Sequence, residues 1–345
     1  MGKRIIQAVA GSGKTTSLVG NLNLTDRFLL VTYTRNNTEH LRISIIKKFG
    51  YFPANITLYS YFQFLIKVCY NPFLFDKVHA HGINWKKTPD FTLKLKRKDP
   101  RFYLTKERAL YHNRIAKLCL DLNIKEINKR IDKYYDYLFF DEVQDLAGHD
   151  FNLMLNISPQ NTELLYVGDF YQHTFDTSRD GVVNKNLHQN RVKYFQMWEN
   201  VGFVVDMECL KYSHRCSKTV CDFVRNQIGI DIYAIDERKS SINYVTSDEE
   251  IMRILKNDSI IKLFYDESHK YDCFSMNWAI SKGLDDFDDV CVVLNKKTNV
   301  LYNRNQLSTL PESTKNKFYV ACTRTKRNLF FIAQELLDKY KIKVL

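Results

Sequence analysis

The chain alternates between short, continuously apolar runs and segments in which apolar residues recur at helical spacing. Continuous apolar runs are typical of strands buried on both faces, as in a parallel sheet with helices on either side. One segment with helical spacing, residues 37–48, follows the first long apolar run. The alternation predicts an α/β fold. The pattern places strands at residues 5–6, 27–32, 137–140, 163–167, 259–265, 289–294 and 328–332.

Polar residues lie at or just beyond the ends of two of these predicted strands. Asp141 and Glu142 come directly after residues 137–140, and Asp169 lies just beyond residues 163–167. In open parallel sheets, ligands bind at the carboxyl ends of the strands. We therefore expect a functional site at this edge.

A glycine-rich turn lies near the start of the chain, between a short apolar stretch and a predicted helix. It fits the pattern G-x-x-x-x-G-K-[ST], except that Ala8 stands where the first glycine is expected. Successive N–H groups of such a turn face a phosphate at a helix N-terminus. Lys14 is expected to reach the β- and γ-phosphates, and the Thr15 hydroxyl to ligate Mg²⁺. The expected phosphate-binding residues are Ala8, Gly11, Ser12, Gly13, Lys14, Thr15 and Thr16.

Four further residues have the chemistry of nucleotide hydrolysis. Asp141 suits Mg²⁺, held directly or through water, and Glu142 can orient and deprotonate the attacking water. Arg215 and Arg324 are candidates for stabilising charge on the γ-phosphate, a role worth roughly 10³–10⁵ in rate.

Charge is unevenly distributed along the chain. The formal net charge of the 345 residues is +12, and residues 76–133 hold sixteen Lys and Arg against seven Asp and Glu. This concentration suits a polyanion such as nucleic acid, and a solvated basic surface explains it equally well.

Cysteine usage and hydropathy indicate the compartment. The eight cysteines form no C-x-x-C pair, which favours reduced thiols in a cytoplasmic protein over a disulfide framework. No apolar run approaches the roughly 18 residues of a membrane span, and the glycine-rich turn follows the N-terminus at once, so we expect neither a membrane segment nor a signal peptide.

Taken in order, these residues resemble the motifs of superfamily 1 helicases of the UvrD/Rep type. In the first motif of that family, alanine is common at the position of Ala8. The segments at 141–145, 167–172 and 320–324 resemble D-E-x-Q-D, V-G-D-x-x-Q and V-A-x-T-R. Further matches follow in order at residues 32–36, 57–62, 210–215 and 282–285.

The resemblance implies two RecA-like domains, each with a parallel sheet covered by helices, and a nucleotide site in the cleft between them. The first domain is expected at residues 1–205, with a basic insertion at about 76–133 that turns helical from Lys106. The second domain is expected at residues 206–345.

The resemblance also implies roles for single residues. Gln144 and Gln172 would couple the γ-phosphate to the nucleic-acid path. His214, Gly283 and Asp285 would lie at the nucleotide. The residues expected at single-stranded DNA are Thr32, Tyr33, Thr57, Tyr59, Phe175 and Lys282.

The chain departs from the family at the residues that would bind the adenine base. A glutamine motif that reads the base usually precedes the glycine turn by some twenty residues, and we expect this chain to lack it because the turn lies so near its start. His214 stands where a tyrosine would stack on adenine. The large accessory domains of full-length relatives are also reduced, the first to residues 76–133.

These features predict an ATP- and Mg²⁺-dependent motor stimulated by single-stranded nucleic acid, with 3′-to-5′ polarity on DNA implied by the family and RNA still open. The alternative is an ATP-gated binding subunit that switches a partner, such as a nuclease or a replication, repair or defence factor, without processive motion.

Overall fold

The computed structural model describes residues 2–284 and 287–342, which form two compact units. The first consists of Met1–Ile6, Thr15–Gly168 and Phe175–Asp206, and the second of Gln7–Lys14, Asp169–Thr174 and Met207–Leu345. The glycine-rich turn thus packs with the second unit, although its flanking segments belong to the first.

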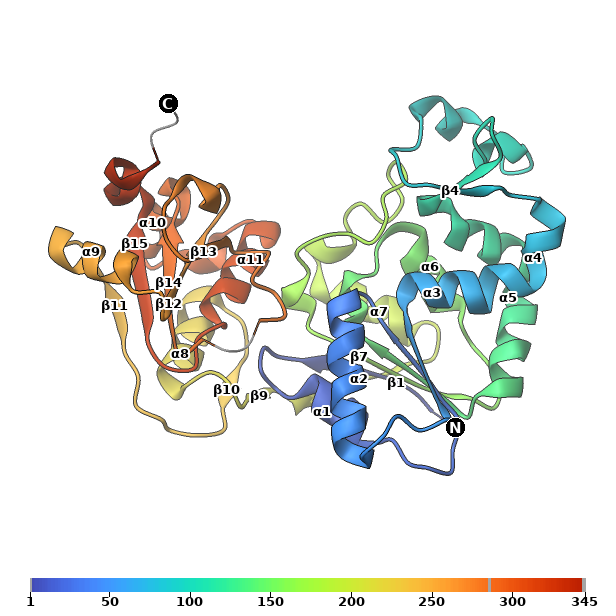
Figure 1. Ribbon diagram of the computed structural model, residues 1–345, viewed down its shortest axis with the longest axis horizontal. Helices are drawn as coiled ribbons and strands as arrows, with labels where there is room; N and C mark the ends of the chain where they lie inside the picture. The colour runs from blue at the N-terminus through green and yellow to red at the C-terminus, as the bar shows by residue number, and fades with distance from the viewer. Residues whose placement is uncertain (1, 285–286, 343–345) are drawn as a thin grey trace. The chain divides into compact units, whose positions relative to one another are not determined.

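A six-stranded sheet forms the centre of the first unit (Figure 1). Its strands follow the order β3 (Ile56–Ser60), β2 (Phe28–Thr32), β6 (Tyr137–Asp141), β7 (Glu163–Gly168), β1 (Lys3–Ala8) and β8 (Val204–Leu210). The pairs β2–β3, β2–β6 and β6–β7 are parallel, so these four strands end at one edge of the sheet. The predicted α/β class is confirmed.

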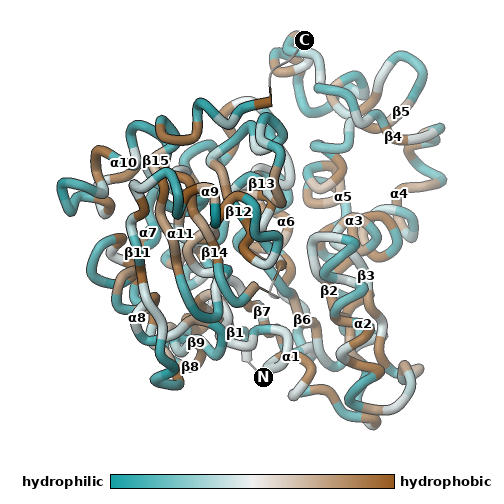
Figure 2. The backbone as a smooth tube through the Cα atoms, turned by 60° about the vertical axis from the view of Figure 1, so that its left-hand side comes forward, coloured by the Kyte–Doolittle hydropathy of each residue, from teal (hydrophilic) through white to brown (hydrophobic). Residues whose placement is uncertain are grey.

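Helices connect the strands of this sheet. They are α1 (Lys14–Gly20), α2 (Arg35–Phe49), α6 (Gly148–Asn156) and α7 (Arg191–Glu199). Local sequence sets the ends of α2: the Thr34 hydroxyl accepts a hydrogen bond from the Asn37 N–H, and Gly50 closes the helix at φ 81°. In Figure 2 the strands carry much of the hydrophobic colour, as expected for strands buried on both faces.

The basic insertion follows β3. The chain first runs through α3 (Tyr61–Phe64), a π-helix (Leu65–Tyr70) and α4 (Asn71–Val78). Two short strands, β4 (Gly82–Asn84) and β5 (Ala109–Tyr111), pair in parallel beyond α4, and α5 (Ile115–Tyr134) returns the chain to the sheet (Figure 1).

The predicted helix from Lys106 was wrong for its first nine residues. Arg108 has φ 60°, in the left-handed region, and residues 109–111 extend to pair with β4. Strand pairing with a segment distant in sequence overrides the local helical spacing here.

The second unit contains a five-stranded parallel sheet. Its order is β11 (Ile242–Tyr244), β15 (Leu329–Ala333), β14 (Asp289–Leu294), β12 (Ile260–Phe264) and β13 (Ser275–Asn277). The short strands β9 (Tyr212–Ser213) and β10 (Tyr233–Ala234) pair separately. The helices are α8 (Lys218–Phe223), a π-helix (Val224–Ile228), α9 (Asp248–Lys256), α10 (Lys296–Asn303), α11 (Glu312–Cys322) and a 3-10 segment (Gln334–Tyr340).

The core of the second unit takes in part of the glycine-rich turn. Val9 and Ala10 are buried in the same apolar cluster as Trp278, Tyr319 and Phe331. This packing holds the backbone of the turn in place. Across residues 2–284 and 287–342, no helix has both the length and the apolar character that a membrane crossing requires.

Candidate functional site

The predicted acidic pair lies at the end of β6. Asp141 is buried, and its Oδ1 accepts a hydrogen bond of 3.0 Å from the Glu142 N–H. Glu142 has φ 60° and ψ 41°, a left-handed conformation that costs a residue with a side chain roughly 1–3 kcal/mol. Such strain recurs at functional sites.

Gln144 lies against both the acidic pair and the end of β7. Its Nε2 donates a hydrogen bond to Glu142 Oε2, and its Oε1 faces Gly168. A Cβ on Gly168 would lie 2.4 Å from that oxygen, closer than atoms tolerate. The glycine of the V-G-D-x-x-Q segment therefore makes room for the glutamine of D-E-x-Q-D.

Two aromatic residues predicted to contact nucleic acid meet in the first unit. The rings of Tyr33 and Phe175 lie 5.5 Å apart, although the residues are distant in sequence. Burial, followed by the charges of Asp145 and Asp150, raises the pKa of Tyr33 to about 12, so the ring stays neutral beside any phosphate.

The other predicted contacts of the first unit differ in exposure. Tyr59 is half-buried, and the Lys67 ammonium lies 5.1 Å from its ring. Thr57 is also half-buried. Thr32 is fully buried, and its hydroxyl has no hydrogen-bond partner within the described residues.

The glycine-rich turn contains two glycines in the left-handed region. Gly11 and Gly13 have φ values of 70° and 81°, which residues with side chains rarely adopt. A Cβ on Gly11 would lie 2.5 Å from Arg215 Cβ and 2.8 Å from Ser213 Oγ. The turn and the predicted arginine segment thus touch at van der Waals distance within the second unit.

The Ser12 hydroxyl of the turn is buried and has no partner in the part of the chain that the structure describes. An unsatisfied buried hydroxyl costs about 1–3 kcal/mol, so a polar ligand at the turn would relieve that cost. The left-handed glycines and this hydroxyl fit a bound phosphate chain. The half-buried Thr15 hydroxyl and the Asp141 carboxylate are hard oxygen ligands of the kind that Mg²⁺ prefers.

Asp169 is the centre of a buried hydrogen-bond network in the second unit. Its Oδ2 accepts bonds from the Tyr319 hydroxyl (3.0 Å) and from Gln172 Nε2 (2.9 Å). The Tyr319 oxygen in turn accepts a bond of 2.8 Å from the Ala10 N–H of the turn. Burial and the Asp169 charge raise the pKa of Tyr319 well above its usual range, so the phenol keeps its proton. This network joins the turn, the V-G-D-x-x-Q segment and α11.

Sequence reasoning missed Tyr319 and gave Asp169 no role. Asp169 carries a signal, because it is the acidic residue of V-G-D-x-x-Q. Tyr319 directly precedes the V-A-C-T-R segment, but its neighbours do not distinguish it from an ordinary core tyrosine.

The two predicted arginines differ in their surroundings. Arg215 is half-buried, and its Nη1 donates to the Thr323 carbonyl oxygen at 3.1 Å. Arg324 is buried and donates to the carbonyl oxygens of Val320 and Leu284. In this conformation the structure holds Arg324 through backbone oxygens.

The remaining predicted nucleotide residues also lie in the second unit. His214 is exposed, and its N–H donates to the Gly11 carbonyl oxygen at 2.9 Å, which places it beside the turn. Gly283 has φ 86°, and Lys282 is half-buried. Asp285 lies outside the described residues.

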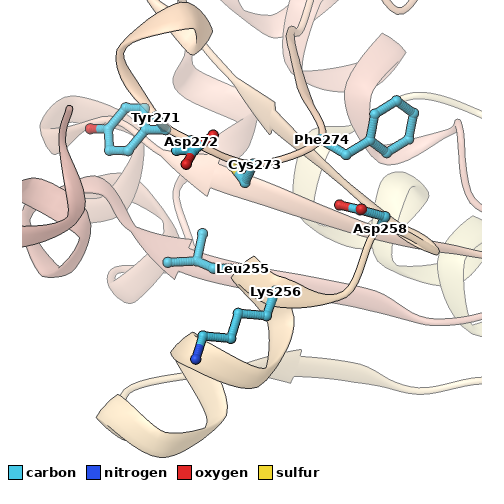
Figure 3. Close-up of a pocket in the computed structure, with 7 residues that line it drawn as sticks. All are labelled: Leu255, Lys256, Asp258, Tyr271, Asp272, Cys273 and Phe274. Atoms are coloured by element: carbon cyan, nitrogen blue, oxygen red, sulfur yellow. The ribbon is translucent and has the colours of Figure 1, made fainter.

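A separate pocket of about 680 Å³ opens on the second unit (Figure 3). It is lined by Leu255 and Lys256 of α9, by Asp258, and by residues 271–274. These residues are all distinct from the predicted nucleotide and nucleic-acid residues.

The chain matches a known protein family over most of its length. The family model of the viral superfamily 1 RNA helicase core domain matches residues 120–333, more than half of the chain. No curated protein matches the chain.

Solved structures resemble the fold of the chain. Arterivirus nonstructural protein 10, a helicase solved with DNA, is 16% identical, with a TM-score of 0.51 over 96% of this chain and 60% of that protein. The PRRSV helicase is 14% identical, with a TM-score of 0.46 over 99% of this chain and 54% of that protein. The chain thus spans less than two thirds of the length of these structures.

Proposed function

The chain belongs to the viral superfamily 1 RNA helicase core family, and we propose that it is an ATP-dependent motor that moves along single-stranded nucleic acid. The observation that most supports this proposal is the convergence of motif segments in the second unit. The turn at Gly11 touches Arg215, and the Asp169 network ties the same turn to Tyr319. A nucleotide bound at the turn would therefore affect several motif segments at once, because they contact the turn directly or through hydrogen bonds.

In this proposal, residues of the chain divide the work on ATP. The backbone of Gly11 to Gly13 and the Lys14 ammonium bind the phosphates. Thr15 and Asp141 hold Mg²⁺, which neutralises charge on the phosphates when bound. Glu142 takes the proton from the attacking water, and Gln144, bonded to Glu142, orients that carboxylate.

The nucleic-acid strand would lie along the aromatic residues of the first unit. Tyr33 and Phe175 form one contact, and Tyr59 with Lys67 forms another. Stacking on such rings tolerates any base sequence. The UvrD/Rep resemblance implies DNA and 3′-to-5′ movement, whereas the description of the matched family names RNA. The tests therefore use both DNA and RNA, and they measure movement in both directions.

The first test is ATP hydrolysis with and without single-stranded DNA or RNA. We expect the strand to stimulate turnover, and Lys14→Ala and Glu142→Gln each to lower it by about 10²–10⁴-fold while the thermal unfolding curve stays unchanged. Lys47→Ala and Glu39→Gln, on the exposed face of α2, are the matched controls and should retain full activity. Strand-stimulated hydrolysis that persists in Glu142→Gln would contradict this mechanism.

Directional movement separates a motor from an ATP-gated switch. A motor displaces streptavidin from one biotinylated end of a single strand and leaves the other end occupied. A switch subunit hydrolyses ATP but displaces streptavidin from neither end. The end that is cleared gives the polarity.

A further inference from the structure

One tryptophan of the insertion lies in solvent. Trp85 directly follows β4, and 62% of its surface is exposed. The other two tryptophans of the chain, Trp198 and Trp278, are fully buried. An exposed indole forgoes the hydrophobic gain of burial, and tryptophan is enriched at interfaces.

Neighbouring rings hold Trp85 in place. It stacks on His112 with 5.6 Å between ring centroids and 23° between planes, and the Phe62 ring lies 4.6 Å away. His112 Nδ1 lies 3.1 Å from the Asn84 carbonyl oxygen, which fixes the imidazole against β4. Trp85, His112 and Phe62 are called the Trp85 platform below. A ring held by its neighbours loses little conformational entropy when a ligand binds.

The Trp85 platform adjoins a predicted nucleic-acid segment. Phe62 is in α3, whose first turn is capped by Ser60 at the end of β3. Tyr59, predicted to contact the strand, lies three residues before Phe62. The platform therefore extends this segment onto the insertion.

Two lysines directly follow the tryptophan of the platform in the sequence. Lys86 and Lys87 follow Trp85 and are exposed. Lys87 makes a surface ion pair of 3.3 Å with Asp90, whereas Lys86 makes no ion pair within the described residues. Lys86 is thus an exposed cation next in sequence to an exposed ring, and the two match the parts of a nucleotide unit, its phosphate and its base.

We propose that the Trp85 platform is an additional binding site for one unpaired base of a single strand, with Lys86 at the neighbouring phosphate. The inference rests on the proposed function in so far as the chain binds single strands. It adds a base contact on the insertion, because Trp85 and His112 lie outside the helicase motifs, whereas Phe62 is the last residue of the matched segment 57–62.

Tryptophan fluorescence tests this site directly, because Trp85 is the one exposed tryptophan. Titrating the full chain with a single-stranded DNA or RNA oligonucleotide should quench the Trp85 emission as a base stacks on the indole. Trp85→Ala should weaken binding, followed by fluorescence anisotropy of a labelled oligonucleotide, by roughly 5- to 150-fold. Trp85→Phe keeps an aromatic face and should bind within a few-fold of the native chain. Hydrolysis in the absence of a strand should be unchanged in both variants.

The outcomes distinguish this inference from the proposed function. If the native chain binds the strand and is stimulated by it, but Trp85 emission is constant and Trp85→Ala binds as tightly as the native chain, the platform is not a base site. If no strand binds or stimulates the native chain, the motor proposal itself fails. Equal losses in Trp85→Ala and Trp85→Phe, with unchanged unfolding curves, would also overturn stacking as the mode of contact.

Discussion

At the scale of single residues, Gly168 shows how two motif segments constrain each other. Gly168→Ala would place a Cβ 2.4 Å from Gln144 Oε1 and 2.9 Å from Val143 Cγ1. Gln144 must then move and lose its bond to Glu142, the predicted base. We expect steady-state ATP hydrolysis to show a fall in kcat of about 10- to 100-fold, because small misplacements of catalytic groups have effects of this size.

Two further variants separate this cause from a general loss of stability. A Cβ on Gly20, at the end of α1, meets no atom within 4 Å, so Gly20→Ala should retain its activity. Combining Gly168→Ala with Gln144→Ala relieves the closest clash and should recover part of the thermal stability without recovering kcat. Full activity in Gly168→Ala would show that the position of Gln144 does not matter.

The sequence motifs are the part of the candidate site that could be predicted from the sequence. The glycine turn, D-E-V-Q-D and V-A-C-T-R are contiguous, and their residue types follow from phosphate and metal chemistry. Trp85 and Tyr319 have no such local signature, because their importance comes from exposure in one case and from a distant carboxylate in the other. Burial and long-range pairing are properties of the folded chain.

At the scale of elements, a buried ion pair fastens the insertion to the loop that carries Phe175. Arg114, just before α5, donates two hydrogen bonds of 2.8 and 2.7 Å to Asp180, and His149 Nε2 lies 3.0 Å from the same carboxylate. Arg114 also donates to the Phe102 carbonyl oxygen. Local sequence patterns do not indicate this pair, since its members lie 66 positions apart.

Removing one partner of this pair should destabilise the first unit. Asp180→Asn or Arg114→Leu leaves a buried group without its counter-charge, and we expect a loss of about 3–5 kcal/mol in the free energy of unfolding by urea. Asp90→Asn is the control, because that carboxylate forms an exposed ion pair with Lys87, and its loss should change the free energy of unfolding by less than about 1 kcal/mol. A loss below 1 kcal/mol in both Asp180→Asn and Arg114→Leu would contradict the assignment.

The same pair predicts a pH dependence. Burial alone raises the pKa of Asp180, but hydrogen bonds from His149 and Arg114 outweigh it and hold the pKa below its ordinary value. A carboxyl with a lowered pKa in the folded state adds stability above its unfolded pKa of about 3.9, and that stability is lost as the pH falls through the folded value. Between about pH 5 and about pH 2, Asp180→Asn should therefore lose less free energy of unfolding than the native chain does. Urea unfolding at a series of pH values measures this difference.

At the scale of the whole molecule, positive charge is concentrated in one segment. Residues 76–133 contribute +9 of the net charge of +12, which leaves +3 for the rest of the chain. If this segment contacts phosphates, each lysine that does so releases counterions. A plot of the logarithm of the binding constant against the logarithm of the salt concentration then falls with a slope of about 0.7 per contact on single strands.

Lys96→Gln combined with Lys98→Gln should therefore reduce the slope of this plot for strand binding by up to about 1.4. The matched pair Lys296→Gln and Lys297→Gln removes the same charge from exposed positions of the second unit and should leave the slope nearly unchanged. Equal slopes for the two double variants would show that the basic segment is only a solvated surface, which is the alternative that the net charge alone did not exclude.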